Sequence, residues 1–208
     1  MVALFHMNVV GTVSNLPLIK NSWLFVEFFF VLSGFVLTHT YLEKLQVPSD
    51  FLAFAKKRFI RIWPLHFFVT CLFIPYAIAA GFVGVELHDR FSIFAFLNNV
   101  LLIQALGLNE GYTWNIPARS ISVEFYTYMV FGALLLLCRR FFWSLAAFIL
   151  VLAAICLASV SDMGDVYQFA ILRCLYSFFA GCVVYRLHRI KIWQPKSALW
   201  EYIALLGM

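Results

Sequence analysis

The chain has 208 residues, of which 64% are hydrophobic, 19% aromatic and only 12% charged, and its mean hydropathy is +0.92. Soluble domains carry roughly 25% charged residues, so this composition excludes an ordinary soluble protein and indicates an integral membrane protein. The net charge of +5 does not indicate nucleic-acid binding, because the basic residues form short clusters between apolar segments, as at a membrane surface.

Apolar segments of spanning length follow one another along the chain. A transmembrane helix needs about 20 apolar residues. Partial segments at 1–10 and 198–208 look like halves of further helices, so we expect a fragment of a longer membrane protein without a cleaved signal peptide. The pattern predicts an all-α, polytopic transmembrane helix bundle that forms one domain over residues 1–208. The full-length segments are 23–42, 60–81, 120–138, 141–160 and 167–187.

The stretch 91–106, FSIFAFLNNVLLIQAL, is ambiguous because polar amide side chains interrupt it. Basic residues favour the cytoplasmic side of a membrane, and they cluster in an expected loop at 43–61, at 139–140 and over 186–196. If 91–106 crossed the membrane, the cluster at 139–140 would lie outside. We therefore expect a re-entrant or interfacial segment that is buried in protein or lines a wet cavity. A short full crossing is the alternative.

Three ionisable residues fall within apolar segments, near the side opposite the basic clusters. An ionisable group at the centre of a span costs roughly 2.5–3.5 kcal/mol, so such groups are candidates for function. His6 and Glu27 are expected at similar depth on neighbouring helices, where an acid beside an imidazole would form a general base. The alternatives are a packed histidine at His6, an interfacial acid at Glu27, and a structural ion pair of Glu124 with Arg119.

Two arginines at the opposite, cytoplasmic side form a different candidate site. Arg58 and Arg61 are three residues apart, so they share one face of a helix. Two guanidinium groups on one face can bind phosphate through paired hydrogen bonds. The alternative is ordinary anchoring of basic residues at the membrane surface, which also explains Lys56 and Lys57.

The remaining polar residues give weaker indications. The five cysteines lie within or at the ends of apolar segments, form no CxxC pair and are expected to be free thiols. No metal or tightly bound cofactor is expected. Ser33 and Gly34 favour close approach of two helices. The other histidines show no zinc-ligand spacing and carry little signal: His39, His66, His88 and His188.

Several stretches together resemble the membrane-bound acyltransferase 3 family of bacterial cell-surface glycan O-acyltransferases. VEFFFVLSGFVLTHTY resembles a family segment in which an acid precedes FFxLSGF, and RFIRIWP resembles the family Arg-x-x-Arg motif. SISVEFYTY is similar to a Ser-Val-Glu-Phe-Tyr segment, and LRCLYSFFAGCVVYRL looks like a later helix. VALFHMNVV resembles the end of the family's first helix, which carries a histidine.

The resemblance implies an enzyme that moves an acyl group, acetyl in many members, from acyl-CoA as co-substrate to a hydroxyl of an envelope glycan or glycolipid. His6 matches the catalytic base and Arg58 and Arg61 match the pair associated with CoA. Glu27 is expected to orient His6, and Glu124 and Tyr126 are expected to bind the acceptor or to line its passage. The protein is expected in the cytoplasmic membrane among its lipids.

Two other functions stay open from the sequence. A transporter or flippase would use the intramembrane acids and histidine to relay protons. A truncated acyltransferase without activity would carry the same motifs.

Overall fold

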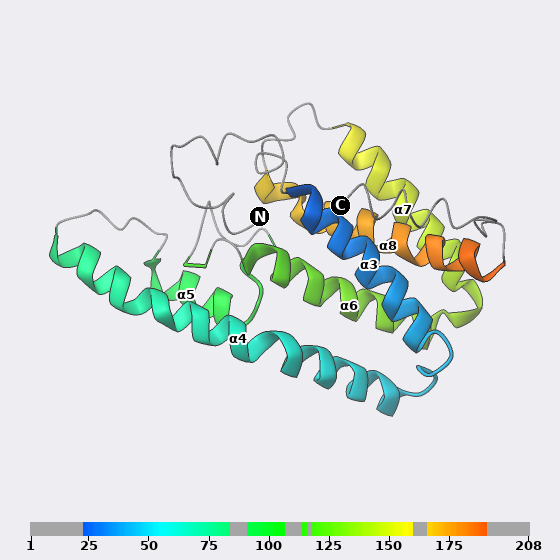
Figure 1. Ribbon diagram of the computed structural model, residues 1–208, viewed down its shortest axis with the longest axis horizontal. Coiled ribbons are helices and arrows are strands. Elements are labelled where there is room, and N and C mark those ends of the chain that lie inside the picture. The colour runs from blue at the N-terminus through cyan, green and yellow to red at the C-terminus, as the bar shows by residue number, and fades with distance from the viewer. Residues whose placement is uncertain (1–22, 84–90, 107–113, 116–117, 160–165, 191–208) are drawn as a thin grey trace, which may run out of the picture.

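The computed structural model describes residues 23–83, 91–106, 114–115, 118–159 and 166–190, and the regular structure in these ranges is entirely helical (Figure 1). Five of the helices in this part are long and apolar enough to cross a membrane, which confirms the predicted polytopic bundle. The elements are α3 (Trp23–Tyr41), α4 (Pro48–Phe82), α5 (Ile93–Val100), α6 (Arg119–Leu137), the 3₁₀ turn η3 (Arg139–Phe141), α7 (Phe142–Ala158) and α8 (Val166–Arg189). The partial segments at 1–10 and 198–208 lie outside the described residues.

Helix α4 begins at Pro48, so the expected loop at 43–61 is largely helical and that prediction was wrong. The Asp50 carboxylate explains the early start, because it accepts hydrogen bonds from the backbone N–H groups of Gln46 and Val47 at 3.0 and 3.1 Å. The helix then continues for 35 residues, which corresponds to roughly 52 Å. Arg58 and Arg61 therefore lie on a helix, well inside the first half of α4.

The helix directions follow from the contacts between them. Helices α4 and α6 are antiparallel, because Phe54 packs near Phe131 while Phe59, further along α4, packs near the earlier Phe125. Helices α3 and α8 are parallel, with ion pairs from Glu27 to Arg173 near their starts and from Glu43 to Arg189 at their ends. All basic clusters of the described residues consequently lie toward one end of the bundle, as the topology prediction requires.

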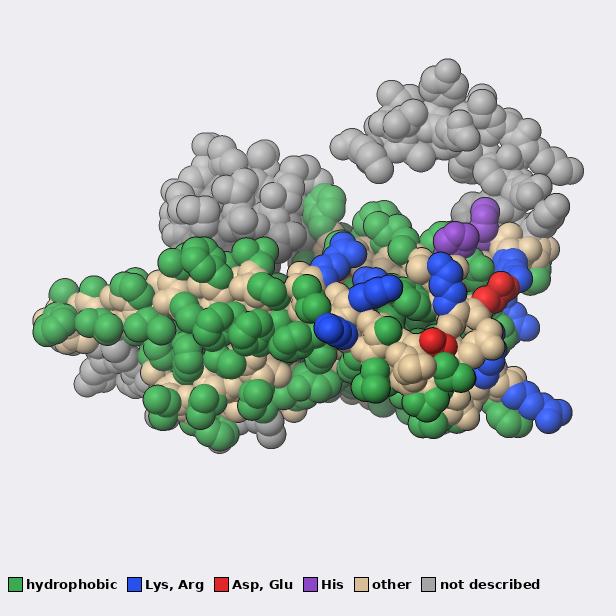
Figure 2. Space-filling view, turned by 90° about the horizontal axis from the view of Figure 1, so that it is seen from below, with side chains coloured by type: hydrophobic (Ala, Val, Ile, Leu, Met, Phe, Trp, Pro, Cys, Tyr) green, Lys and Arg blue, Asp and Glu red, His purple; other side chains and the backbone are tan. Residues whose placement is uncertain are grey.

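Basic side chains gather toward that end on the face that α4 presents, while hydrophobic side chains cover the other end (Figure 2). The segment between α4 and α6 returns without crossing. Its helix α5 has eight residues, which rise only about 12 Å and cannot span a bilayer. This agrees with the predicted re-entrant or interfacial segment.

The polar residues of this segment are buried in protein. Asn99 donates from its side chain to the Ala95 carbonyl, and Gln104 donates to the Ala118 carbonyl at 3.2 Å. Helix α4 binds the carboxyl end of α5, since the Trp63 indole donates to the Val100 carbonyl at 2.9 Å. These bonds satisfy polar groups that lipid could not satisfy.

Small residues bring α3 and α8 into close contact, as predicted for the Ser33-Gly34 pair. A Cβ atom at Gly34 would overlap the backbone carbonyl of Phe178, and a Cβ atom at Gly181 would overlap that of Val31. The two backbones therefore touch directly, which is the usual role of glycine between membrane helices.

Candidate functional site

A cavity of about 500 Å³ lies between α3, α4 and α6. Its lining residues recur every three or four positions, so each helix contributes one face. Most of the wall is apolar, and the polar side chains come from all three helices. The lining residues are Phe29, Leu32, Ser33, Val36 and Leu37 of α3; Arg58, Arg61, Ile62, Leu65, His66 and Val69 of α4; Asn115 and Ala118; and Ile121, Glu124 and Tyr128 of α6.

Arg58 is held by aromatic rings and keeps its positive charge available. Its guanidinium carbon lies 5.6, 5.8 and 5.9 Å from the ring centroids of Tyr41, Phe54 and Tyr128, and one Nη donates to the Tyr41 hydroxyl at 3.3 Å. Aromatic faces stabilise a cation without supplying a counter-charge. The Nε–H of Arg58 is buried and has no hydrogen-bond partner in the described structure.

Arg61 lies one turn further along α4 and lines the same cavity with an exposed side chain. Neither Arg58 nor Arg61 forms an ion pair with a carboxylate of the described residues. The cavity therefore holds two guanidinium groups that are free to bind an anion.

Glu124 is the acidic residue of the cavity lining. It is 7% exposed, and it accepts hydrogen bonds from the Ser33 hydroxyl at 3.1 Å and from the Tyr128 hydroxyl. The Tyr128 hydroxyl also lies 3.4 Å from Ser33 Oγ. The sequence predicted Glu124 and the arginines at opposite sides of the membrane, but the structure places them around one cavity, and that depth prediction was wrong. The error arose because α4 carries its arginines further into the bundle than a surface loop would.

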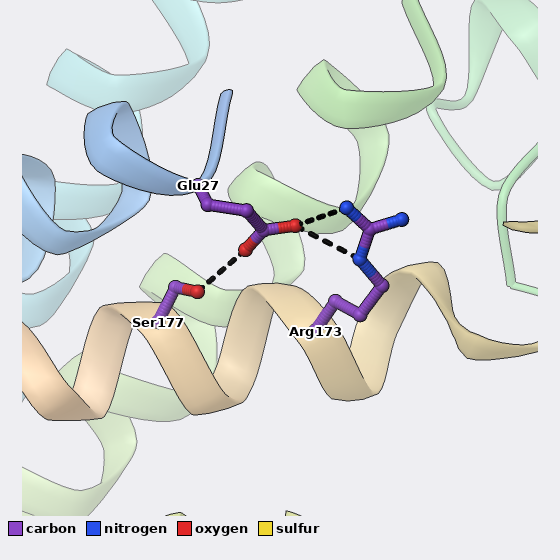
Figure 3. A network of polar contacts seen from close by, with 3 residues as sticks. All are labelled: Glu27, Arg173 and Ser177. Carbon is purple, nitrogen blue, oxygen red and sulfur yellow. Dashed lines mark hydrogen bonds and ion pairs between the residues drawn. The ribbon is translucent and has the colours of Figure 1, made fainter. Parts of the chain in front are cut away.

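Glu27 has partners on α8 (Figure 3). Its Oε1 accepts from Arg173 Nε at 2.9 Å and from Arg173 Nη2 at 2.5 Å, and its Oε2 accepts from the Ser177 hydroxyl at 2.5 Å. Both charged side chains keep about a fifth of their exposure, at 19% for Glu27 and 21% for Arg173. The sequence did not identify Arg173, because the two residues are 146 positions apart.

The other predicted site residues lie elsewhere. His6 is outside the described residues, so its place relative to Glu27 stays a prediction. The Tyr126 hydroxyl lies 3.4 Å from the Leu101 carbonyl beside the segment of α5, and Tyr126 is not among the described residues that line the cavity. Tyr128, one turn after Glu124, lines the cavity in its place.

The described residues hold no group of three or more histidines, cysteines or acids suited to a metal ion, and all five cysteines are free thiols. The free-thiol prediction is confirmed. The cavity itself offers anion binding by guanidinium groups next to a carboxylate and hydroxyls, within a mostly apolar wall.

Comparison with known proteins agrees with these motifs. A family model described as an acyltransferase domain matches residues 6–208. The chain belongs to this family, acyltransferase 3. The match confirms the resemblance carried by the motifs.

A curated relative, "Protein 2 in picA locus" of Rhizobium radiobacter, is 34% identical over 120 residues, which cover 50% of this chain. The chain spans 61% of the length of that relative. No solved structure matches the chain.

Proposed function

We propose that the protein transfers an acyl group, acetyl in the first instance, from acyl-CoA to a hydroxyl of a cell-envelope carbohydrate or glycolipid. The cavity between α3, α4 and α6 carries the proposal, because Arg58 and Arg61, which form no salt bridge with a described carboxylate, line it together with Glu124. The clusters of basic residues at one end of the bundle support an orientation in the cytoplasmic membrane with that end toward the cytosol.

The donor binds through its phosphates at Arg58 and Arg61. A guanidinium forms paired, charge-assisted hydrogen bonds with phosphate oxygens. The aromatic rings around Arg58 hold its side chain in place before the ligand arrives, so little conformational entropy is lost on binding. The apolar wall beyond the arginines suits the thin, uncharged arm that joins the phosphates of CoA to its thioester.

The acceptor hydroxyl reacts at a base, for which we propose His6. As the hydroxyl oxygen attacks the thioester carbon, His6 takes the hydroxyl proton, the carbon–sulfur bond breaks, and the leaving thiolate recovers the proton. A positioned base contributes roughly 10²–10⁴-fold to such a rate. Glu27 would orient His6. A carboxylate offers about four acceptor sites, so the bonds to Arg173 and Ser177 leave room for one more.

Glu124 is proposed to bind the acceptor. Its carboxylate is fixed by the hydroxyls of Ser33 and Tyr128, and it can accept a further hydrogen bond from a sugar hydroxyl. Tyr126 is proposed as an outer contact of the same acceptor, at the side of the segment of α5.

The direct test is transfer of labelled acetyl from acetyl-CoA to envelope glycans in membrane vesicles that contain the full-length protein. We expect transfer by the wild type and its loss in Arg58→Met/Arg61→Met, with the affinity for acetyl-CoA lowered by roughly 10²-fold or more. Arg189→Met is the matched control, because Arg189 is an exposed arginine of α8 away from the cavity.

If the wild-type protein moved glycans across the membrane without acylating them, the proposal would be wrong and the protein would be a flippase. A separate variant, His6→Ala, tests the base: wild-type acylation at equal expression would end the role given to His6, while donor binding by the arginines would remain.

A further inference from the structure

Besides Glu124, the cavity lining contains a buried histidine, His66. One of its ring nitrogens has no partner in the described structure. His66 lines the cavity from α4 and is 2% exposed. Its Nε2 lies 2.8 Å from the backbone carbonyl oxygen of Asn99. A carbonyl oxygen can only accept, so Nε2 carries the hydrogen and Nδ1 keeps a lone pair.

The lone pair of Nδ1 is unsatisfied. The atom is buried and has no hydrogen-bond partner in the described structure. Two nearby donors point elsewhere: the Thr70 hydroxyl donates to the carbonyl of His66 itself at 2.8 Å, and the Asn115 amide donates to the Thr70 hydroxyl at 3.4 Å. Since nearly all buried polar groups in proteins are paired, Nδ1 is a place for a hydrogen-bond donor that enters with a ligand.

The position of His66 on α4 indicates which part of a ligand would reach it. His66 follows Arg58 by eight residues and Arg61 by five, so it lies about 12 and 7.5 Å further along the helix axis. A ligand with its phosphates on the arginines would extend along the cavity wall toward His66. The arm of CoA between the phosphates and the thioester contains amide groups, whose N–H atoms are neutral donors.

The charges around His66 favour a hydrogen-bond acceptor over a group that takes up a proton. A protonated His66 would add a third positive charge to a cavity that already holds Arg58 and Arg61, while its own Nε2 contacts only a neutral carbonyl. Glu124, the acid of the cavity lining, is bonded instead to the hydroxyls of Ser33 and Tyr128. Like charges disfavour the charged form. The surroundings therefore suit a neutral imidazole that accepts a hydrogen bond and keeps its charge state.

We propose that Nδ1 of His66 accepts a hydrogen bond from an amide N–H of the acyl-CoA arm, and so aligns the thioester in the cavity. This inference rests on the proposed function, because it assumes acyl-CoA as donor. It makes His66 a donor-binding residue that is distinct from the arginine pair, which binds the phosphates.

The test compares acetyl-CoA with acetyl-pantetheine, which keeps the arm and the thioester but lacks the nucleotide phosphates. In purified full-length protein, His66→Phe should weaken the binding of both compounds by the same factor, about 2- to 12-fold for one neutral hydrogen bond. Arg58→Met/Arg61→Met should weaken only acetyl-CoA. His66→Gln retains a donor and an acceptor and should restore affinity in part. Thr70→Val, beside His66 on α4, is the matched control and should change neither affinity.

A second measurement uses the unaltered protein, in case His66→Phe fails to fold. In ¹⁵N spectra of histidine-labelled protein, assigned with His66→Gln, the unprotonated nitrogen of His66 should move to lower frequency when acetyl-pantetheine binds, as expected when a lone pair accepts a hydrogen bond.

The outcomes separate this inference from the proposed function. An unchanged ¹⁵N signal, or equal affinity of the His66→Phe and wild-type proteins for acetyl-pantetheine, would overturn the inference while arginine-dependent binding of acetyl-CoA upheld the proposed function. Slower transfer in His66→Phe at unchanged donor affinity would also overturn it and would assign His66 to the acceptor. Failure of the wild type to bind acetyl-CoA would overturn both.

Discussion

The contact between α3 and α8 and the cavity between α3, α4 and α6 differ in how their charged side chains are paired. Between α3 and α8, Glu27 and Arg173 neutralise each other through two nitrogen–oxygen contacts. In the cavity, Arg58 and Arg61 have no carboxylate partner among the described residues, and aromatic rings surround Arg58. A charge inside a membrane protein is expensive, so pairing indicates a structural role and its absence indicates a ligand. Each substitution below should therefore affect either folding or binding, according to its region.

The largest effect is expected at the backbone contact that holds α3 against α8. Gly34→Ala places a methyl group on the Phe178 carbonyl, which belongs to backbone and cannot move without separating the helices. We expect a loss of about 3 kcal/mol or more of unfolding free energy, or no folded protein at all. Thermal unfolding in detergent measures this.

Gly132→Ala is the matched control for that substitution. The nearest atoms to its added methyl group belong to the rings of Phe51 and Phe54, which are side chains and can shift more easily than backbone. A clearly smaller fall in unfolding temperature than for Gly34→Ala is expected, and equal destabilisation by the two substitutions would argue against a special contact at Gly34.

The next largest effect is expected at the ion pair between Glu27 and Arg173. Among the described residues, Arg173→Met leaves Ser177 as the remaining partner of the Glu27 charge, and it should lower the free energy of unfolding by about 3 kcal/mol. This is the low end for a buried pair, because both side chains keep some exposure. Glu27→Gln/Arg173→Met removes both charges and should recover most of the loss in a denaturation experiment.

The same double variant distinguishes a structural role of Glu27 from a role in catalysis. If Glu27 also orients His6, the restored protein should fold yet transfer acyl groups slowly. Wild-type transfer by this variant would limit Glu27 to its structural pair with Arg173.

The sequence predicted much of the fold because spanning helices are encoded locally. Apolar length located the five long helices of the described residues, and the distribution of basic residues predicted a segment at 91–106 that does not cross the membrane. The start of α4 was missed, since the Asp50 cap and Pro48 lie within a stretch whose charges suggested a loop. Helix boundaries depend on such single contacts.

The candidate site was only partly predictable. Arg58 and Arg61 were recognisable by their spacing and Glu124 by its charge within an apolar segment, and all three line the cavity although their predicted depths were wrong. Tyr128 could have been found in place of Tyr126, because a residue four positions after Glu124 shares its helix face. Arg173 and His66 could not, since a single polar residue in an apolar helix does not show which distant element it faces.

A moderate effect is expected from removing the charge of the cavity acid. Glu124→Gln can still accept hydrogen bonds from Ser33 and Tyr128, so stability should change little. Acyl transfer should slow by roughly 10- to 100-fold through weaker binding of the acceptor hydroxyl. Affinity for acetyl-CoA should rise by about threefold or more, because a negative charge near the phosphate site is lost. Equilibrium binding and initial rates measure the two changes separately, and a parallel fall in both would place Glu124 in donor binding.

The smallest effect is expected at a pair that is charged but exposed. Glu43 and Arg189 lie 2.7 Å apart, yet their side chains are 70% and 55% exposed, so water screens the attraction. Arg189→Met should change the free energy of unfolding by about 0–1 kcal/mol, against about 3 kcal/mol for Arg173→Met on the same helix. Denaturation of the two variants in one detergent provides the comparison. Two equal losses would show that burial does not set the contribution of these pairs to stability. The absence of a described carboxylate partner at Arg58 and Arg61 would then no longer indicate a ligand.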